Sequence, residues 1–402
     1  MERIEIAIVG GGLIGPALAL ALTSAGFEVI VLESQPVETR AAPDFDGRAY
    51  AVALASQRLL ETLGVWDALE KAAQPILDIH VGEGVGPRPL IHFDPRELDE
   101  GRFGWMVEDR HLRGALLSRT DKAGIRHEAP AVVDTVACDG GGAVLTLADG
   151  RRIHAGLVVG ADGRRSAIAR SAGLRRIGWS YRQTGLVNAI SHELPHHGLA
   201  HQSFFAGGPF AVLPLTGNRS SLVWSERRAE ADRLAGLSDD LFIAEVAARV
   251  GDRLGPITLA GKRWAYPLDL TLSTSYVAPR LALVGDAAHG VHPIAGQGMN
   301  MGLRDVAALA EVLTDAARIG EDIGALPVLE RYQQWRRFDA TVMALGMDGL
   351  NRLFSNDVTP LALLRQAGLR AVAGLGEVRR GLMREAIGTA GEVPKLLRGE
   401  AL

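Results

Sequence analysis

The hydrophobic residues of this chain come in short unbroken runs, separated by stretches with helical spacing. This pattern is typical of α/β proteins whose strands are buried on both faces. Residues 4–9 and 28–32 predict two such strands, and the good helix formers at 17–25 predict a helix that Gly26 ends. The beginning of the chain is therefore interpreted as a βαβ unit of about 30 residues.

Further strands and helices follow the same two periodicities. Short apolar runs predict strands at residues 131–136, 143–147, 156–160, 184–190, 209–214, 219–224 and 281–284, the first two forming a hairpin. Helical spacing predicts helices at residues 56–72, 110–122, 238–250 and 303–317, and along nearly all of the chain after residue 325. Because the stretch from 178 to 276 is rich in strands, we expect it to form a separate sheet-based layer.

The same pattern predicts a discontinuous domain organisation. A length of 402 residues is enough for about two domains. We expect the first domain to combine residues 1–75, 106–177 and 277–325, the second to combine residues 76–105 and 178–276, and a helical region to occupy residues 326–402. Residues 76–105 are rich in glycine, proline and short β-like pieces.

Composition narrows the setting in which these domains work. The formal net charge is −4, so no basic excess indicates binding to nucleic acid. Cys138 is the only cysteine, which excludes an internal disulfide and fits a reducing compartment. We expect its side chain to be buried as a small apolar group rather than to be a reactive thiol. The N-terminus shows no signal-peptide pattern, and no apolar run approaches the roughly 20 residues of a membrane span. We expect a soluble, cytoplasmic protein, or at most one that is peripheral on the inner face of the membrane.

A glycine-rich loop after the first predicted strand carries the first chemical signal. The GxGxxG pattern consists of Gly10, Gly12, Leu13, Ile14 and Gly15. Its glycines permit a tight turn and close approach of a pyrophosphate, and the following helix offers free amides to the phosphates. Glu33 follows about 20 residues later and is placed for a ribose hydroxyl. Pro16 is tolerated because the first turn of a helix needs no amide donor there. This unit predicts a dinucleotide site.

Two later strand ends indicate which dinucleotide binds. The segment GADGRRS at 160–166 ends a strand with Asp162 and a glycine, which suits close approach to a pyrophosphate. The segment GDAAH at 285–289 places the carboxylate of Asp286 where it can accept a hydrogen bond from a polyol. Residues 293–300 offer free amides at the start of a helix, suited to stabilise negative charge on a ring. A ribityl chain is such a polyol and a reduced isoalloxazine carries such a charge, so FAD is the predicted cofactor.

With these three motifs the chain resembles the class A flavoprotein aromatic hydroxylases over nearly its whole length. The resemblance implies an α/β fold: a Rossmann-like FAD-binding domain of the glutathione-reductase/p-hydroxybenzoate-hydroxylase type, an inserted mixed β-sheet substrate domain and a C-terminal helical region. The ADP half of FAD would be held by Gly10, Gly12, Leu13, Ile14, Gly15 and Glu33. Asp162 would lie near the pyrophosphate and also serve NADPH, and Gly285 and Asp286 would bind the ribityl chain. The flavin ring would be bordered by Pro293, Gly296, Gly298, Met299 and Asn300.

The same resemblance assigns two arginines. Arg48, in DGRAYAV, matches the family arginine near the flavin and its mobile loop. Arg110, in VEDRHLRGAL, matches the polar residue that reaches the ribityl chain. For each arginine a solvated surface charge is the alternative. At the reaction site we expect Arg48 and the backbone of Pro293. His292, which lies with His289 in the predicted flavin loop, is expected to have an orienting role rather than to act in acid–base catalysis.

The match narrows to the ubiquinone-biosynthesis hydroxylases of the UbiH/UbiF type through DGRAYAVALASQRLLETLGVWDAL, GPFAVLPLTGNRSSLVW, HPIAGQGMNMGLRD and LMREAIGTAGEVPKLLRG. This resemblance implies a flavoprotein monooxygenase, an oxidoreductase that hydroxylates the aromatic ring of a polyprenylated phenol. NADPH or NADH would reduce the flavin as a transient visitor, since the chain carries no second nucleotide fingerprint. O2 would then give a flavin hydroperoxide that attacks the ring. The ring carbon attacked, the isoprenoid length, the reductant (NADPH, NADH or a ferredoxin) and the oligomeric state, including a homo-oligomer, stay open.

Substrate contacts and partner surfaces are predicted less directly. The apolar residues expected around the substrate are Phe210, Leu213, Trp224, Tyr266 and Pro267, with ordinary core packing as the alternative. Histidines between 192 and 201 are spaced like metal ligands, but Pro195 and Gly198 interrupt any helix there, so no metal is expected. From Arg352 to Leu402 the chain has eight Lys or Arg and five Asp or Glu, with leucines at helical spacing at 361–364. Such basic helices predict peripheral contact with an anionic membrane or with a Ubi-type complex, and packing on the chain itself is the alternative.

Three other functions fit parts of the pattern. A flavin-dependent halogenase would be expected to carry a WxWxIP segment, where this chain has only RWAYPL at 263–268. A hydroxylase of a soluble aromatic substrate, of the salicylate type, would be expected to have a polar pocket and no lipid-facing tail. A flavin-binding subunit of a quinone-biosynthesis complex without turnover of its own is the non-enzymatic alternative.

Overall fold

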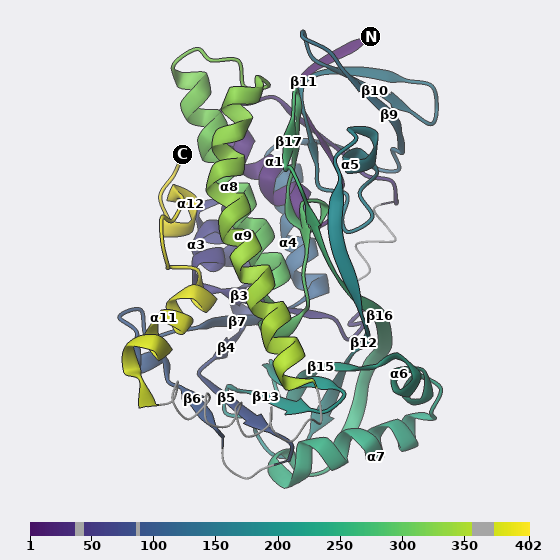
Figure 1. Cartoon of the computed structure of the whole chain (residues 1–402), viewed down its shortest axis with the longest axis vertical. Coiled ribbons are helices and arrows are strands. Elements are labelled where there is room, and N and C mark those ends of the chain that lie inside the picture. Colours follow the sequence, from purple (N-terminus) through teal and green to yellow (C-terminus); the bar gives the residue numbers. More distant parts are fainter. Residues whose placement is uncertain (37–43, 86–88, 356–373) are drawn as a thin grey trace.

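Two eight-stranded sheets organise the chain, one in the upper part of Figure 1 and one in the lower part. This computed structural model describes residues 1–36, 44–85, 89–355 and 374–402. The leucine-rich segment 361–364 lies outside the described residues.

The first sheet is built around β1 (Glu2–Val9), which pairs in parallel with β2 on one side and β11 on the other. Across this sheet the order is β17 (Val277–Ala278), β18 (Leu281–Leu283), β11 (Arg152–Gly160), β1, β2 (Val29–Leu32) and β8 (Arg126–Glu128). The antiparallel hairpin of β9 (Val133–Cys138) and β10 (Ala143–Leu147) joins the edge of β11. Ile6, Ile8 and Ile30 are fully buried, which explains why these strands are apolar on both faces. The predicted βαβ unit and hairpin are confirmed.

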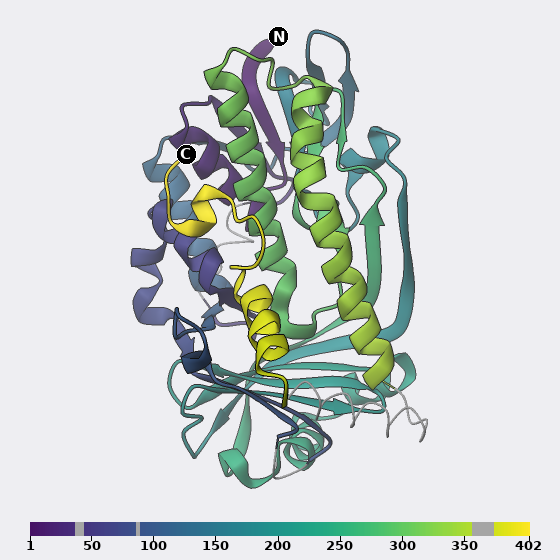
Figure 2. The ribbon, with the colours of Figure 1, turned by 60° about the vertical axis from the view of Figure 1, so that its left-hand side comes forward.

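Helices cover this sheet and connect its strands. They are α1 (Ile14–Ser24), α4 (Asp109–Lys122), α5 (Ala167–Ser171), α8 (Gln297–Arg318) and α9 (Leu326–Phe354). The long helices α8 and α9 run side by side in Figures 1 and 2. The C-terminal helices α11 (Gly376–Ile387) and α12 (Lys395–Arg398) lie near α8 and α3 (Leu54–Thr62), and a Cβ on Gly388 would lie 2.8 Å from the Cβ of Ala55. This close contact places the segment after α11 directly against α3.

The second sheet is mostly antiparallel. Its order is β19 (His289–Gly290), β16 (Ile257–Ser273), β12 (Arg176–His192), β15 (Arg219–Arg227), β14 (Gly208–Leu215), β13 (Leu199–Phe205), β5 (Asp78–Glu83) and β6 (Ile91–Phe93). Helices α6 (Arg228–Ala235) and α7 (Asp239–Val250) lie on one side of it (Figure 1). Phe210, Trp224 and Phe242 form part of a separate apolar core between this sheet and the two helices.

A small third sheet links the two larger ones. It consists of β3 (Ala49–Ala53), β7 (Gly104–Glu108) and β4 (Gln74–Ile76), all antiparallel, and it leads into α3 (Leu54–Thr62). The segment 76–105 thus contributes β5 and β6 to the second sheet, while β4 and β7 at its two ends belong to the third. The predicted division into domains stays a prediction.

Three local predictions need correction. The helix expected at residues 56–72 is α3, which ends at Thr62, because Gly64 has a φ of +70° and two short 3-10 turns, Trp66–Ala68 and Glu70–Ala72, follow. The strand expected at 184–190 is the 17-residue β12. Cys138 is exposed rather than buried, because it ends the edge strand β9.

Candidate functional site

The glycine-rich loop between β1 and α1 lies against the end of β11. Gly10 has a φ of +113°, and a Cβ there would lie 2.3 Å from the carbonyl oxygen of Ala161. A Cβ on Gly15 would lie 1.9 Å from the carbonyl oxygen of Gly10. No larger residue fits either position without moving backbone. The fold therefore brings the first motif into contact with the second, the segment that contains Asp162.

Glu33 follows β2 beside this loop. The residue is only 5% exposed, and its Oε2 accepts a hydrogen bond from the backbone N–H of Gly11 at 2.7 Å. Its Oε1 accepts a second one from the N–H of Gln35 at 2.9 Å. The carboxylate is thus held at the mouth of the glycine loop, where the sequence predicts a ribose.

Asp162 uses one carboxylate oxygen for structure and leaves the other without a partner. Its Oδ2 accepts hydrogen bonds from the N–H groups of Ala167 and Ile168, at 2.7 and 3.1 Å, and so caps α5. Its Oδ1 is buried and has no hydrogen-bond partner in the described part of the chain. Because a buried acceptor without a donor costs about 1–3 kcal/mol, this oxygen is suited to a donor from a bound molecule.

The third motif is tied to the second through Arg164. Asp286 lies in the short turn Gly285–Ala287, and its Oδ2 accepts a hydrogen bond from Nε of Arg164 at 3.1 Å. Arg164 also donates to the carbonyl oxygen of Val291 at 2.6 Å, and Arg176 donates to the carbonyl oxygen of Asp286 at 3.0 Å. The Asp286 side chain remains 37% exposed, so it is accessible to a ligand hydroxyl.

Near this turn the start of α1 packs against the second turn of α8. α8 follows the turn Ile294–Gly296, and its N-cap Gly296 has a φ of +62°. In the described part of the chain neither α8 nor α1 has a side-chain cap, and neither helix has an acidic residue in its first turn. A Cβ on Gly302 of α8 would lie 2.7 Å from Cδ1 of Ile14, at the start of α1. The free amides and positive dipole ends of two helices can therefore bind two anionic groups.

The residues expected to border a flavin ring surround the start of α8. Asn300 uses its side chain to hold this start against β3: its Oδ1 accepts from the N–H of Ala53 at 3.0 Å and its Nδ2 donates to the carbonyl of Ala51 at 2.9 Å. A Cβ on Gly298 would meet only Cγ2 of Val291, at 4.0 Å. Pro293, Gly296 and Met299 are half-buried. Their contacts with a flavin stay a prediction, in which Asn300 takes part through its backbone.

A buried charge network fixes the turn that carries Asp286. Asp305 is fully buried and accepts hydrogen bonds from the N–H of Gly285 at 2.9 Å, Nε2 of His289 at 2.6 Å and Nε of Arg336 at 2.9 Å. Burial alone would raise the pKa of this carboxyl, but His289, Arg336 and the hydrogen bonds hold the pKa below its ordinary value. Asp305 thus stays ionised and joins α8, α9 and the flavin-motif turn.

Arg48 is held between the start of α4 and the second sheet. Its Nε donates to Asp46 at 2.9 Å, and its Nη2 lies 3.2 Å from Oδ2 of Asp109 at the start of α4. Burial opposes its charge, yet Asp46 and Asp109 raise the pKa of the guanidinium above its ordinary value. The guanidinium carbon lies 5.0 Å from the ring centroid of Trp264, whose Nε1 donates to the carbonyl of Asp46 at 2.8 Å. Arg48 is therefore an ordered cation rather than a solvated surface charge.

The side chain of Arg110 contacts Glu108 and Phe45. Its Nε donates to Oε2 of Glu108 at 2.8 Å, and its guanidinium lies 5.6 Å from the ring of Phe45. Glu108 is buried and also pairs with Arg219 of β15 at 2.7 Å. The predicted contact of Arg110 with a ribityl chain stays a prediction.

His292 is buried beside the start of α8. Its Nδ1 accepts a hydrogen bond from the N–H of Ile294 at 3.3 Å, its Nε2 has no partner among the described residues, and its ring packs edge-on against Tyr181 at 5.1 Å. Burial, assisted by the charge of Arg164, lowers the pKa of His292 to about 4. The ring is therefore neutral near neutral pH, which suits an orienting role rather than proton transfer.

Strand alternation separates the residues expected to contact a substrate. Phe210 and Trp224 pair across β14 and β15 and belong to the apolar core that the second sheet forms with α6 and α7. For these two residues core packing, the alternative, is correct. Leu213 packs against the larger apolar core, which includes the first sheet, and Tyr266 lies beside Trp264 with their rings stacked at 6.2 Å. Tyr266 is 40% exposed and Pro267 is also exposed.

The histidines near residue 200 make ordinary hydrogen bonds. His192 binds the carbonyl of Leu194 at 2.7 Å and the hydroxyl of Ser220 at 3.0 Å. His196 binds the carbonyl of Leu215 at 2.8 Å. Within the described ranges, no three His, Cys, Asp or Glu residues gather as a metal site.

Comparison with known proteins agrees with this geometry. A family model described as "FAD binding domain" matches residues 3–341. Ubiquinone hydroxylase UbiL of Rhodospirillum rubrum is 47% identical over 402 residues, covering 99% of this chain and 93% of that protein. The 3-demethoxyubiquinol 3-hydroxylase of Escherichia coli K12 is 39% identical, covering 96% of this chain and 98% of that protein. The chain belongs to the FAD-binding family of ubiquinone-biosynthesis hydroxylases.

Solved structures show the same fold at lower sequence identity. The p-nitrophenol 4-monooxygenase of Pseudomonas putida DLL-E4 is 21% identical with a TM-score of 0.81, covering 98% of this chain and all of that chain. A probable FAD-dependent monooxygenase from Pseudomonas aeruginosa, PqsL, is 24% identical with a TM-score of 0.79, covering 92% and 99%. The predicted fold class is confirmed.

The residues of this family member fit FAD. The N-termini of α1 and α8, which have no side-chain cap among the described residues, fit a pyrophosphate and an anionic ring. The carboxylate oxygen of Asp162 that lacks a donor among those residues and the accessible carboxylate of Asp286 fit hydroxyl groups. The cofactor is therefore FAD, as the motifs predict.

Some residues of this site carry no sufficient signal in the sequence. Arg164 stands inside the GADGRRS motif, but its pairing with Asp286 joins positions 122 residues apart. Asp305 and Arg336 lie on two different helices, and Trp264 meets Arg48 from the second sheet. For Asp305 the sequence offers one hint, a charged residue among the apolar residues of the helix predicted at 303–317.

Proposed function

We propose that this chain is an FAD-dependent monooxygenase that hydroxylates the aromatic ring of a polyprenylated phenol in ubiquinone biosynthesis, with NADPH or NADH as reductant and O2 as co-substrate. The observation that carries the proposal is that the start of α1 meets the Asp286 turn and the second turn of α8 beside the Gly10 loop, with no side-chain cap on either helix among the described residues. Full-length similarity to two enzymes named as hydroxylases of ubiquinone compounds supports the substrate class.

FAD, when bound, accepts hydride from the nicotinamide and, with O2, supplies the oxygen atom that enters the ring. The amides at the start of α1 bind the pyrophosphate, and those at the start of α8 stabilise negative charge on the flavin ring. Glu33 binds the ribose, and Asp286 accepts from the ribityl chain. Neutral His292, through its Nε2–H, orients a group at the ring without moving a proton.

Water exclusion follows from what lines the start of α8. Val291, Ile294 and Met301 are buried around it, and Asn300 closes it against β3. A dry site is required because water diverts the reduced flavin and O2 to hydrogen peroxide. Arg48 is positioned at the same side by Asp46, Asp109 and Trp264 and gives this region a fixed positive charge.

Lipid analysis would test this function. A strain that lacks the gene should accumulate a polyprenylphenol missing one ring hydroxyl, identified by mass spectrometry of lipid extracts. The wild-type gene should restore the quinone and an Asp286→Ala variant should not, whereas Asp232→Ala on the exposed part of α6 serves as the matched control. Normal quinone without any intermediate would contradict the proposal.

Purified enzyme would separate the alternatives. Substrate-stimulated NADPH oxidation by the FAD-loaded protein excludes a subunit without turnover of its own. Faster and better coupled oxidation with a prenylated phenol than with salicylate excludes the soluble-substrate hydroxylase. The reverse preference, with product formed from salicylate, would replace the present proposal by that alternative.

We further propose that the C-terminal helices meet a membrane surface. In the part of the chain that the structure describes, no helix is both long and apolar enough to span a bilayer. Met383 and Ile387 of α11 are buried against the rest of the chain, so for that face of the helix the alternative, packing on the chain itself, is correct. Its other face leaves Val378 and Leu382 exposed, as α9 leaves Phe338, Val342 and Leu345. Flotation with anionic vesicles but not with neutral ones is expected. If the protein floated with neither kind of vesicle, this membrane proposal would be contradicted.

A further inference from the structure

The pairing of β12 and β16 is interrupted next to Asn188. Val187 faces Trp264, but Ala189 faces Ala260, so residues 261–263 of β16 all lie opposite Asn188. Such a bulge takes residues out of the ladder and opens the sheet locally.

The loop that carries Arg48 covers this bulge from one side. A Cβ on Gly261 would lie 2.8 Å from the backbone nitrogen of Gly47, and a Cβ on Gly47 would lie 2.8 Å from the carbonyl oxygen of Lys262. The N–H of Lys262 donates to the carbonyl of Asp46 at 3.1 Å. Backbone therefore rests directly on backbone here, and the bulge and the loop cannot move independently.

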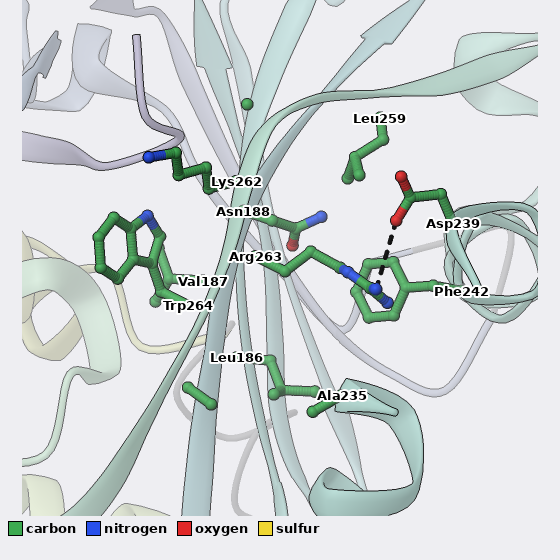
Figure 3. Close-up of a pocket in the computed structure, with 12 residues that line it drawn as sticks. Leu186, Val187, Asn188, Ala235, Asp239, Phe242, Leu259, Lys262, Arg263 and Trp264 are labelled. Atoms are coloured by element: carbon green, nitrogen blue, oxygen red, sulfur yellow. Dashed lines mark ion pairs between the residues drawn. The ribbon is translucent and has the colours of Figure 1, made fainter. Parts of the chain in front are cut away.

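A cavity of about 490 Å³ borders the bulge on the side of α7. Its apolar walls come from Leu186 on β12, Leu259 on β16 and Phe242 on α7. Figure 3 shows the amide of Asn188 and the guanidinium of Arg263 reaching into the space between β16 and α7. The volume is within the usual range of small-molecule sites, roughly 300–1,000 Å³.

Two hydrogen-bond donors at this cavity lack partners. Asn188 is 1% exposed, and its Nδ2 has no partner among the described residues. Arg263 donates from Nη2 to the carbonyl of Leu237 at 2.8 Å and pairs with Asp239 at 3.3 Å, but its Nη1 is buried without a hydrogen bond there. Because a buried unpaired donor is costly, the two groups favour a ligand that brings an acceptor.

We propose that this cavity is a second binding site, which takes an aromatic carboxylate. Its carboxylate accepts from Asn188 and Arg263, and its ring lies among Leu186, Leu259 and Phe242. Occupancy restrains the bulge and, through Gly47 and Gly261, the loop that holds Arg48. This second site is distinct from the FAD motifs, and it would bind its ligand whichever ring the enzyme hydroxylates.

Calorimetric titration of the FAD-loaded protein with benzoate tests the site. The wild type should bind benzoate, and Asn188→Leu and Arg263→Gln should each weaken that binding about tenfold or more, since each removes a donor to the carboxylate. The matched control is Gln202→Leu, which removes another buried amide nitrogen without a partner from the same sheet, on β13. Asn188→Leu should keep FAD and its thermal midpoint, because an apolar side chain of similar size replaces an unpaired amide.

Hydrogen exchange tests the link to Arg48. Benzoate should slow exchange of the amides of residues 46–48 in the wild type and not in Asn188→Leu. Equal benzoate affinity of the wild type and Asn188→Leu would place binding elsewhere and overturn the site, as would no binding at all, which leaves a cavity that holds only water. Binding that depends on Asn188 without altered exchange would overturn the coupling. None of these readouts needs turnover, so they can fail or succeed independently of the proposed function.

Discussion

Replacing Asp305 with asparagine should destabilise the protein far more than so small a change suggests. Asp305 is fully buried, and its partner Arg336 is only 4% exposed. Removing one member of a buried ion pair costs about 3–5 kcal/mol, because the other charge is left without compensation. Arg336 keeps Asp339, and asparagine keeps an oxygen for the N–H of Gly285, so the lower end, about 3 kcal/mol, is expected.

Urea unfolding followed by tryptophan fluorescence measures this loss, and FAD content should fall with it because the Gly285 turn loses its anchor. Asp339→Asn is the matched control: its side chain is 38% exposed, so it should cost about 1 kcal/mol or less. Asp305→Asn combined with Arg336→Met should recover part of the stability, since the uncompensated cation is gone. Equal losses for Asp305→Asn and Asp339→Asn would refute the argument.

The pH dependence supplies a second check on the same pair. The folded pKa of Asp305 lies below its ordinary value of 3.8, so its contribution is complete above that pH and is lost as the pH falls further. The stability difference between the wild type and Asp305→Asn should therefore stay constant near neutral pH and shrink only in strong acid. A difference that grew on acidification would mean that the carboxyl is protonated in the folded state.

Other predictions follow from single contacts. Gly10→Ala should abolish FAD binding, because its Cβ would meet the Ala161 carbonyl, whereas Gly26→Ala, with open space around it, should cost only about 1–2 kcal/mol for its positive φ; flavin absorbance and melting curves compare the two. Burial lowers the pKa of His292 to about 4 in the folded state, from 6.5, so the protein loses stability as the pH falls from about 6.5 toward 4. In His292→Asn this loss should disappear, and melting temperatures measured across that pH range should stay nearly constant. Arg48→Lys keeps the charge but loses the planar contact with Trp264, so kcat/KM for NADPH-dependent hydroxylation should fall about tenfold or more while FAD stays bound; unchanged kinetics would remove Arg48 from the site.

Much of this protein was readable from short stretches of sequence. The Gly10 loop, the Asp162 turn and the Asp286 turn each lie at a strand end, and each is specified by residues within a few positions of one another. Glu33 follows the next strand, at the distance that a βαβ unit sets. Apolar runs located β1, β11 and the β9–β10 hairpin for the same reason. Local geometry and strand burial depend on near neighbours, so their signals survive in one chain.

Element limits and faces were less predictable. The helix expected to reach residue 72 ends at Thr62, because the positive φ of Gly64 outweighs the helical spacing that follows. Phe210 and Leu213 are both apolar, yet one packs beneath α7 and the other against the larger apolar core that includes the first sheet. Composition alone does not say which face of a sheet is directed toward a cofactor, because a sheet buried on both sides is apolar on both.

The sequence by itself determined the cofactor, the order of its binding motifs and the βαβ start of the fold. Only the tertiary structure decided which charges meet: Arg164 with Asp286, 122 residues apart, and Arg336 with Asp305, 31 residues apart. It also decided that a bulge opposite Asn188 opens a cavity behind the Arg48 loop. Ion pairs and cavities depend on how strands and helices are placed in space, and that placement results from burial summed over the whole chain rather than from any local pattern.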